Sequence, residues 1–116
     1  MQRKFRLTRS IDFKRVRRTG KSYAHPLVVL TVHASETPRV RVGVTAGRSV
    51  GGAVQRNRSK RLLREAMRPF LPALLPGWDV VLIARPTLPL ASLPEIHQAL
   101  AGLLRRAQLL PAPHET

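Results

Sequence analysis

Basic side chains crowd one short stretch of the chain, and their chemistry suits phosphate binding. From Gln55 to Arg68 the sequence reads QRNRSKRLLREAMR, with six basic residues and one asparagine. A row of guanidinium groups can bind a sugar-phosphate backbone, and Asn57 can hydrogen-bond a sugar hydroxyl or a base edge. The alternative is a solvated surface that neutralises itself, but Glu65 is the one acid placed to pair with a cation, Arg61. The stretch therefore predicts a nucleic-acid surface.

A second group of cations surrounds an aromatic residue near the start of the chain. Phe13 is followed by Lys14, Arg15, Arg17 and Arg18. An aromatic ring beside cations can stack on a single-stranded base while the cations hold the backbone of that base. The alternative is that Phe13 belongs to the core, and the residues alone favour this second interpretation.

Glycines precede the basic stretch, but they do not form a nucleotide-binding loop. The Walker pattern needs four residues between its glycines and then a lysine. Here Gly43 and Gly47 enclose three residues and Arg48 follows, which disfavours a nucleotidase. Arg48 and the backbone amides near Gly51 and Gly52 could still hold a single phosphate at a helix N-terminus.

The sequence offers little for catalysis by protein side chains. Six acids are too few and too scattered for a two-metal carboxylate site. The four histidines show no metal-ligand spacing, and the absence of cysteine removes thiol nucleophiles and cysteine-based zinc sites. We expect no catalytic residue and no metal ligand, so any phosphodiester chemistry would use an active site supplied by another molecule.

The basic stretch is predicted to lie on a helix with an apolar stripe. The apolar residues recur with the helical period at Leu62, Leu63, Ala66, Met67 and Phe70. On the opposite side this spacing places four polar residues, which two more cations flank. The four are Asn57, Arg61, Arg64 and Arg68, and the flanking pair is Arg58 and Lys60. Pro69 and Pro72 should make the end of the helix irregular, because each removes an amide donor.

Two further helices are expected, one at each end of the chain. The first covers residues 8–19, with Ser10 as its N-cap and Gly20 at its C-terminal end. The second opens with Ser92 and Glu95, the spacing of a capping box, and carries an apolar face typical of a helix packed on a sheet.

Three segments are predicted to be strands. Residues 26–33 and 39–44 flank a turn-like segment, so we expect them to form a hairpin. In residues 39–44 the valines alternate with arginines, which places the valines on the core face and the arginines on the other. The segment Trp78 to Ala84 is apolar throughout except for Asp79, which favours a strand at the centre of the sheet.

These elements give the order helix, strand, strand, helix, strand, helix. The economical fold is α+β, a two-layer α/β sandwich. With 116 residues the chain can form one compact domain, which we place at residues 1–110, followed by a flexible C-terminal tail at residues 111–116.

The net charge of +15 is unevenly distributed. Residues 1–68 carry eighteen basic residues and three acids, whereas residues 69–116 carry three of each. The mutual repulsion of so many positive charges is relieved most readily by a polyanion, and nucleic acid is the natural partner. The longest apolar run, Val80 to Ala84, has five residues and no signal segment is visible, so we expect a soluble cytoplasmic protein without a membrane partner.

The run from Arg56 to Glu65, RNRSKRLLRE, closely resembles the signature of the protein subunit of bacterial ribonuclease P. The resemblance extends over residues 7–107. Its other parts are Asp12 and Phe13 with Val16 and Gly20, the strand segment RVGV at 41–44, the segment GGAV at 51–54 and the segment IAR at 83–85.

This resemblance implies a small basic subunit that joins a large catalytic RNA. The holoenzyme is an endonuclease that removes the 5′ leader of precursor tRNA by Mg²⁺-dependent hydrolysis, in which the RNA carries the catalysis and the protein alone is inactive. No small-molecule substrate is implied. The family fold is a sandwich with a mixed sheet and a left-handed βαβ crossover, against the usual handedness.

The resemblance also assigns two binding surfaces. The predicted contacts to the catalytic RNA are Arg56, Asn57, Arg58, Lys60, Arg61, Arg64 and Arg68. The predicted contacts to the precursor tRNA leader are Phe13, Lys14, Arg17, Arg48 and Arg85. The resemblance thus favours a leader contact for Phe13 over a core position. Relatives often carry a second aromatic residue where this chain has Arg17, which suggests that leader binding depends more on charge.

Two other classes of protein remain open on composition alone. A structural RNA-binding protein of ribosomal type would have the same charge but no processing role, and the signature run distinguishes it from the ribonuclease P subunit. A protein that binds an anionic membrane would need a long helix with an exposed apolar face. Both apolar stripes of this chain are expected to face a core.

Overall fold

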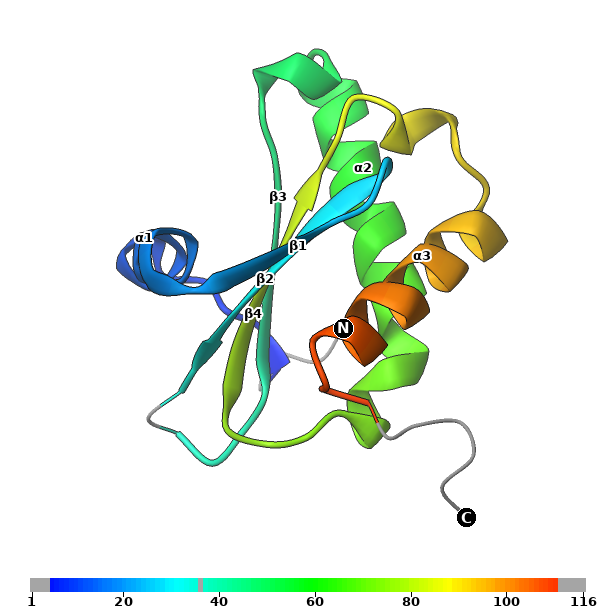
Figure 1. Cartoon of the computed structure of the whole chain (residues 1–116). Helices are drawn as coiled ribbons and strands as arrows, with labels where there is room; N and C mark the ends of the chain where they lie inside the picture. Colours follow the sequence, from blue (N-terminus) through cyan, green and yellow to red (C-terminus); the bar gives the residue numbers. More distant parts are fainter. Residues whose placement is uncertain (1–4, 36, 111–116) are drawn as a thin grey trace.

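Aliphatic and β-branched segments form a four-stranded sheet, and amphipathic segments form the helices that cover it (Figure 1). The computed structural model describes residues 5–35 and 37–110. The predicted tail at residues 111–116 lies outside this range. The helices are α1 (Ser10–Thr19), α2 (Ala53–Met67) and α3 (Leu93–Arg106), and the strands are β1 (Lys21–Ala24), β2 (Val28–Ala34), β3 (Arg41–Ala46) and β4 (Trp78–Ala84). Short 3₁₀ segments include η2 (Arg48–Val50), η3 (Arg68–Ala73) and η4 (Leu88–Leu90).

The strand order in the sheet is β1-β2-β4-β3. Strand β4 pairs antiparallel with β2 and parallel with β3, so the sheet is mixed. The predicted hairpin between residues 26–33 and 39–44 is therefore wrong, because β4 lies between the corresponding strands β2 and β3. Apart from Asp79, strand β4 is apolar on both faces, and most of its residues are buried, as its sequence predicts.

Strand β1 is absent from the predicted order of elements. It is short, begins with Lys21 and Ser22, and is largely exposed, so it carries no hydrophobic alternation that would reveal it. Its place depends on antiparallel pairing with β2, in which Lys21 lies opposite Val32 and Ala24 opposite Val29. A turn of the chain at Gly20 leads directly from α1 into this edge strand.

Helices lie on both faces of the sheet (Figure 1). The main core lies between the sheet and the pair α2 and α3, with Leu30, Leu63, Leu82 and Leu100 fully buried. Helix α1 packs on the opposite face over a smaller cluster of Leu7, Val16 and Val81, with Phe13 and Ile83 against it. The α+β sandwich is confirmed, and α1 adds a partial layer to it.

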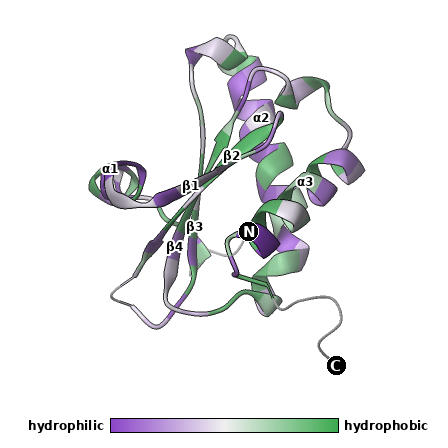
Figure 2. Cartoon of the chain, in the orientation of Figure 1, coloured by the Kyte–Doolittle hydropathy of each residue, from purple (hydrophilic) through white to green (hydrophobic). Residues whose placement is uncertain are grey.

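The connection from β3 through α2 to β4 joins two parallel neighbouring strands. It is the βαβ unit that the family resemblance implies, and its left-handed sense stays a prediction. In Figure 2 the ribbon of α2 carries both hydrophilic and hydrophobic residues. The buried residues of α2 are Ser59, Leu63, Ala66 and Met67, so one side of the helix faces the core and leaves its cations outside.

The ends of the helices follow local chemistry. Glu95 N–H donates to Ser92 Oγ at 3.3 Å and Ser92 N–H donates to Glu95 Oε1 at 3.0 Å, which confirms the capping box. Helix α1 begins at Ser10 rather than at residue 8, and its N-cap is Arg9 instead of Ser10. Position 20 has no room for a side chain, because a Cβ there would lie 2.4 Å from the carbonyl oxygen of Val16, so glycine is required.

Candidate nucleic-acid interface

Helix α2 presents its cations on two different sides. Its buried side is extended by Ser59, whose hydroxyl donates to the carbonyl of Gln55 at 2.9 Å. The spacing of four residues places three half-buried cations on one flank of the helix. These are Arg56, Lys60 and Arg64. The remaining predicted contacts are exposed and form the outward face of α2, namely Asn57, Arg58 and Arg61 on the helix and Arg68 at its C-cap.

The flank carrying Arg64 lies against β3, which is an edge strand of the sheet. There a hollow of about 270 Å³, which we call the β3 cleft, separates α1, β3 and α2. Its lining comprises Arg6, Leu7, Thr8, Phe13, Val42, Gly43, Val44 and Arg64. The structure thus brings a predicted leader contact and a predicted contact of the catalytic RNA into one cleft.

Phe13 is half-buried in this cleft. Its ring lies against the backbone of β3, where a Cβ on Gly43 would come within 2.4 Å of the ring Cζ atom. The absence of a side chain at Gly43 therefore makes room for the ring. Phe13 also packs on the small cluster under α1, so one part of the ring is core and another lines the cleft.

Arg64 has a charge without a partner among the described residues. Its Nε atom is buried and makes no hydrogen bond within residues 5–35 and 37–110. Burial, and in second place the neighbouring charge of Arg6, lowers the pKa of Arg64 from its ordinary value. The guanidinium still stays protonated at neutral pH. Two like charges held together beside an aromatic ring favour the approach of an anion such as phosphate.

The other predicted leader contacts lie outside the β3 cleft. Lys14 and Arg17 are exposed on α1 and line a broad hollow of about 810 Å³ along that helix. Arg48 and Arg85 are exposed beyond the carboxyl ends of β3 and β4, whose last residues Ala46 and Ala84 pair with each other. These cations extend the positive surface on either side of the cleft rather than forming part of it.

A buried ion-pair network, which the sequence pattern did not predict, holds α1 on the sheet. The carboxylate of Asp79 on β4 is fully buried. It accepts hydrogen bonds from Arg41 Nε and Nη2, both at 2.9 Å, and from Arg15 Nη2 at 3.0 Å. Asp12 adds ion pairs to Arg15 at 3.1 Å and to Arg41 at 3.7 Å. The one feature of the sequence that indicates this network is Asp79, a single acid inside the apolar run from Trp78 to Ala84.

The network orients Arg41 as well as α1. The alternation along β3 is confirmed, since Val42 and Val44 are buried and Arg41 faces the other way. Hydrogen bonding to Asp79 raises the pKa of Arg41 more than burial lowers it, and the charge of Asp12 adds to the rise. Because Arg15 lies on the same helix as Phe13, these ion pairs also set the position of the aromatic ring over Gly43.

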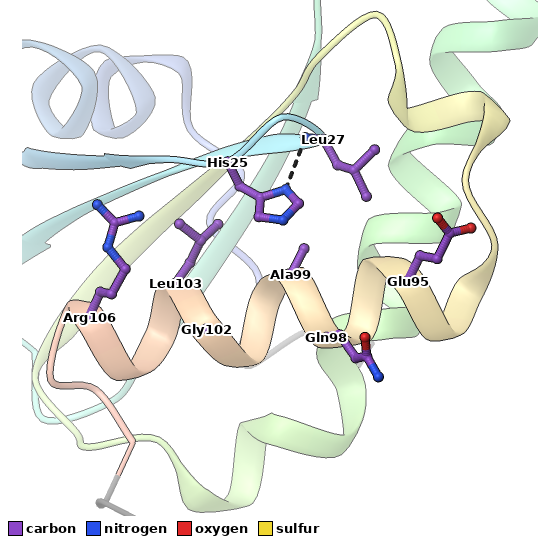
Figure 3. Close-up of a pocket in the computed structure, with 8 residues that line it drawn as sticks. All are labelled: His25, Leu27, Glu95, Gln98, Ala99, Gly102, Leu103 and Arg106. Carbon is purple, nitrogen blue, oxygen red and sulfur yellow. Dashed lines mark hydrogen bonds between the residues drawn. The ribbon is translucent and has the colours of Figure 1, made fainter.

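A further hollow of about 490 Å³ lies between the β1–β2 turn and α3 (Figure 3). Leu27, Ala99 and Leu103 line it together with polar residues, and none of the predicted site residues does. The His25 ring accepts a hydrogen bond from Leu27 N–H at Nδ1, at 3.0 Å. Arg106 donates to the carbonyl of Ala24 at 3.1 Å, so its charge is engaged in the fold.

Within the described ranges, no group of three histidine, cysteine, aspartate or glutamate residues could hold a metal ion. Asp12, next to Phe13 in the chain, and Asp79 on β4 are both engaged by arginines. No helix in the same part of the chain is long and apolar enough to span a membrane.

The fold and this surface define a class, the small basic α+β proteins that bind RNA. The family model for ribonuclease P matches residues 1–108. The ribonuclease P protein component of Herpetosiphon aurantiacus is 46% identical over 109 residues, which cover 94% of this chain and 89% of the relative. That of Chloroflexus aurantiacus is 43% identical over 114 residues, 97% of this chain and 84% of the relative.

Solved structures agree with these relatives. The ribonuclease P protein of Staphylococcus aureus superposes with a TM-score of 0.81 at 27% identity, covering 92% of this chain and 98% of that one. The protein from Thermotoga maritima gives a TM-score of 0.77 at 28% identity, with coverage of 87% and 96%. The chain belongs to the ribonuclease P protein family. It is the protein component of an endoribonuclease that processes tRNA, and its RNA partner is the ribonuclease P RNA.

Proposed function

We propose that the protein uses the two sides of α2 for two RNA molecules in the cytoplasm. The outward face, with Asn57, Arg58, Arg61 and Arg68, binds the catalytic RNA. The β3 cleft binds the single-stranded 5′ leader of precursor tRNA. The observation that supports this assignment is the side chain of Arg64, whose buried Nε has no hydrogen-bond partner within residues 5–35 and 37–110, beside the half-buried ring of Phe13.

Each group in the β3 cleft has a separate part in holding the leader. Phe13 offers a partly open ring on which one base can stack. Arg64 and Arg6 supply cations for the phosphates that flank this base. Beyond the cleft, Lys14 and Arg17 on α1, together with Arg48 and Arg85 at the ends of the strands, attract the strand through charge.

The flank of α2 also connects the two binding surfaces. Arg56, Lys60 and Arg64 follow one another along the helix at intervals of about 6 Å, the rise of four helical residues. A phosphate backbone that leaves the β3 cleft beside Arg64 can therefore pass Lys60 and Arg56. These three residues contact RNA at the junction between the leader and the catalytic RNA.

The reaction itself belongs to the RNA. We propose that Mg²⁺ is held mainly by the RNA and that the protein contributes no catalytic residue. The protein acts by binding the substrate leader and by reducing repulsion between two polyanions, for which its net charge of +15 is suited. Its effect should consequently be greatest when Mg²⁺ is scarce.

Reconstitution with the catalytic RNA tests the proposal. At low Mg²⁺ the protein is expected to restore leader cleavage, while the protein alone cleaves nothing. In the holoenzyme, Phe13→Ala should weaken binding of precursor tRNA by about ten-fold, the value of one stacked base, and leave binding of mature tRNA unchanged. Equal losses for both ligands would show that the β3 cleft does not hold the leader.

A further inference from the structure

A fourth hollow lies between α2 and the start of α3, and Arg64 lines both this hollow and the β3 cleft. It has a volume of about 440 Å³, and its lining residues are Arg58, Arg61, Leu62, Arg64, Glu65 and Leu93. We call it the α2–α3 hollow. Its apolar part comes from two leucines on different helices, the half-buried Leu62 and Leu93, which is 39% exposed.

The charge around the α2–α3 hollow is positive. Three arginines line it against one acid, Glu65, and the carboxylate of Glu65 is engaged in an ion pair with Arg68. Arg58 and Arg61 are both exposed and belong to the outward face of α2. Arg58, Arg61 and Arg64 form no ion pair with any acid that the structure describes. An apolar surface surrounded by such cations suits a ligand that is flat and apolar at its centre and anionic around it.

An unpaired nucleotide has this chemistry, because its base offers an apolar face and its flanking phosphates carry the negative charge. We propose that the α2–α3 hollow takes one unpaired base of the catalytic RNA, which lies against Leu62 and Leu93 while Arg58 and Arg61 hold its phosphates. This inference rests on the proposed function, in which the outward face of α2 binds that RNA. It adds an apolar, base-directed contact to a surface otherwise explained by charge.

The salt dependence of binding distinguishes this proposal from simple phosphate binding. Each phosphate contact contributes about 0.7–0.9 to the slope of log affinity against log salt concentration, whereas burial of an apolar side chain contributes nothing to that slope. Leu93→Ser in the full chain should therefore weaken binding of the catalytic RNA by roughly ten-fold at every salt concentration, from the apolar area that Leu93 buries. The slope should stay that of the wild type.

Leu90→Ser is the matched control. Leu90 is 89% exposed and lies three residues away, outside the hollow, so its replacement should leave the affinity and the slope unchanged. Arg61→Ala is the charge comparison, since it should lower the slope by one phosphate contact. Thermal melts of each free variant, together with Leu93→Ala as a milder change, separate loss of binding from loss of folding.

Chemical probing of the RNA identifies the base. One unpaired nucleotide should be protected in the wild-type complex and in the Leu90→Ser complex, and become reactive with Leu93→Ser. If Leu93→Ser matches Leu90→Ser in affinity and in probing pattern, the hollow has another occupant, such as a protein, and the inference is wrong. If Arg61→Ala also has no effect, the outward face of α2 does not bind the RNA and the proposed function fails as well.

Discussion

The carboxylate of Asp79 joins α1 to the sheet, and Asp79→Asn tests how much of the fold depends on it. Asparagine keeps the shape and one acceptor oxygen but removes the negative charge. Arg41 and Arg15 would then share a buried position without their counter-ion, because Asp79 receives hydrogen bonds from both. Removal of one partner from a buried ion pair costs about 3–5 kcal/mol.

The structure favours the lower end of that range. The side chains of Arg41 and Arg15 are 24% and 39% exposed, so each can regain some hydration, and Asp12 remains beside both. We expect the free energy of unfolding to fall by about 3 kcal/mol. For a domain of this size that corresponds to a melting temperature lower by roughly 10–20 °C.

Urea and thermal unfolding followed by circular dichroism would measure this loss. Asp12→Asn is the matched control, since Asp12 is less buried and its longer ion pair spans 3.7 Å. Its loss should be about 1 kcal/mol, as for a more exposed pair. A loss below about 1 kcal/mol for Asp79→Asn would refute the reasoning that this carboxylate holds α1. If Asp79→Asn still folds at low temperature, the holoenzyme that contains it should also discriminate less between precursor and mature tRNA, because Phe13 on α1 would lose its fixed position.

Three further changes test other parts of the molecule. Arg58→Ala should lower the slope of log affinity for the catalytic RNA against log salt by about 0.7–0.9, whereas Arg105→Ala, on the neutral part of the chain, should not. Gly43→Ala should destabilise the fold by about 1–3 kcal/mol, because its Cβ would meet the aromatic ring at 2.4 Å, while Gly47→Ala meets nothing within 4 Å and should be neutral. Hydrogen bonds with Ser92 lower the pKa of Glu95 below the ordinary glutamate value of 4.5, so the stability that this carboxylate contributes is present above pH 4.5 and is lost as the pH falls through the lowered pKa. Melts of Glu95→Gln between pH 3 and pH 7, a window set by carboxylate titration, should lack this dependence.

The central elements of the fold could be predicted because their signals are local. The apolar run of β4 indicates burial on both faces, and the capping box at Ser92 marks the start of α3. Strand pairing has no local signal of this kind. The turn between β2 and β3 is consistent with a hairpin, and the insertion of β4 between them results from burial across the whole sheet. Strand β1 is too polar and too exposed to be seen before its partner is known.

In the candidate site, too, some features follow from local sequence and others only from tertiary packing. Helical periodicity predicts that Arg64 leaves the apolar stripe, but its neighbours Arg6 and Phe13 come from other elements and follow from the packing of α2 beside β3. The packing of the Phe13 ring on Gly43 depends equally on tertiary contacts. The family resemblance predicts a leader contact for Phe13, while the residues alone favour a core position. In the structure one part of the ring packs on the small core cluster and another part lines the β3 cleft.

The distribution of acids explains how so basic a chain folds before it meets RNA. Each of the four acids that the structure describes has a fixed partner: Asp12 and Asp79 pair with Arg15 and Arg41, Glu65 pairs with Arg68, and Glu95 caps α3. Asp12 and Asp79 neutralise Arg15 and Arg41 where α1 meets the sheet. Without these carboxylates, the desolvation of the two arginines would oppose folding. Among the described residues, the cations of the β3 cleft and most of those on the outward face of α2 have no acidic partner, so their mutual repulsion persists in the free protein. Binding of RNA removes that repulsion in the folded state and so increases the affinity, and the catalytic RNA should stabilise the folded protein by mass action in proportion to the logarithm of its concentration over Kd.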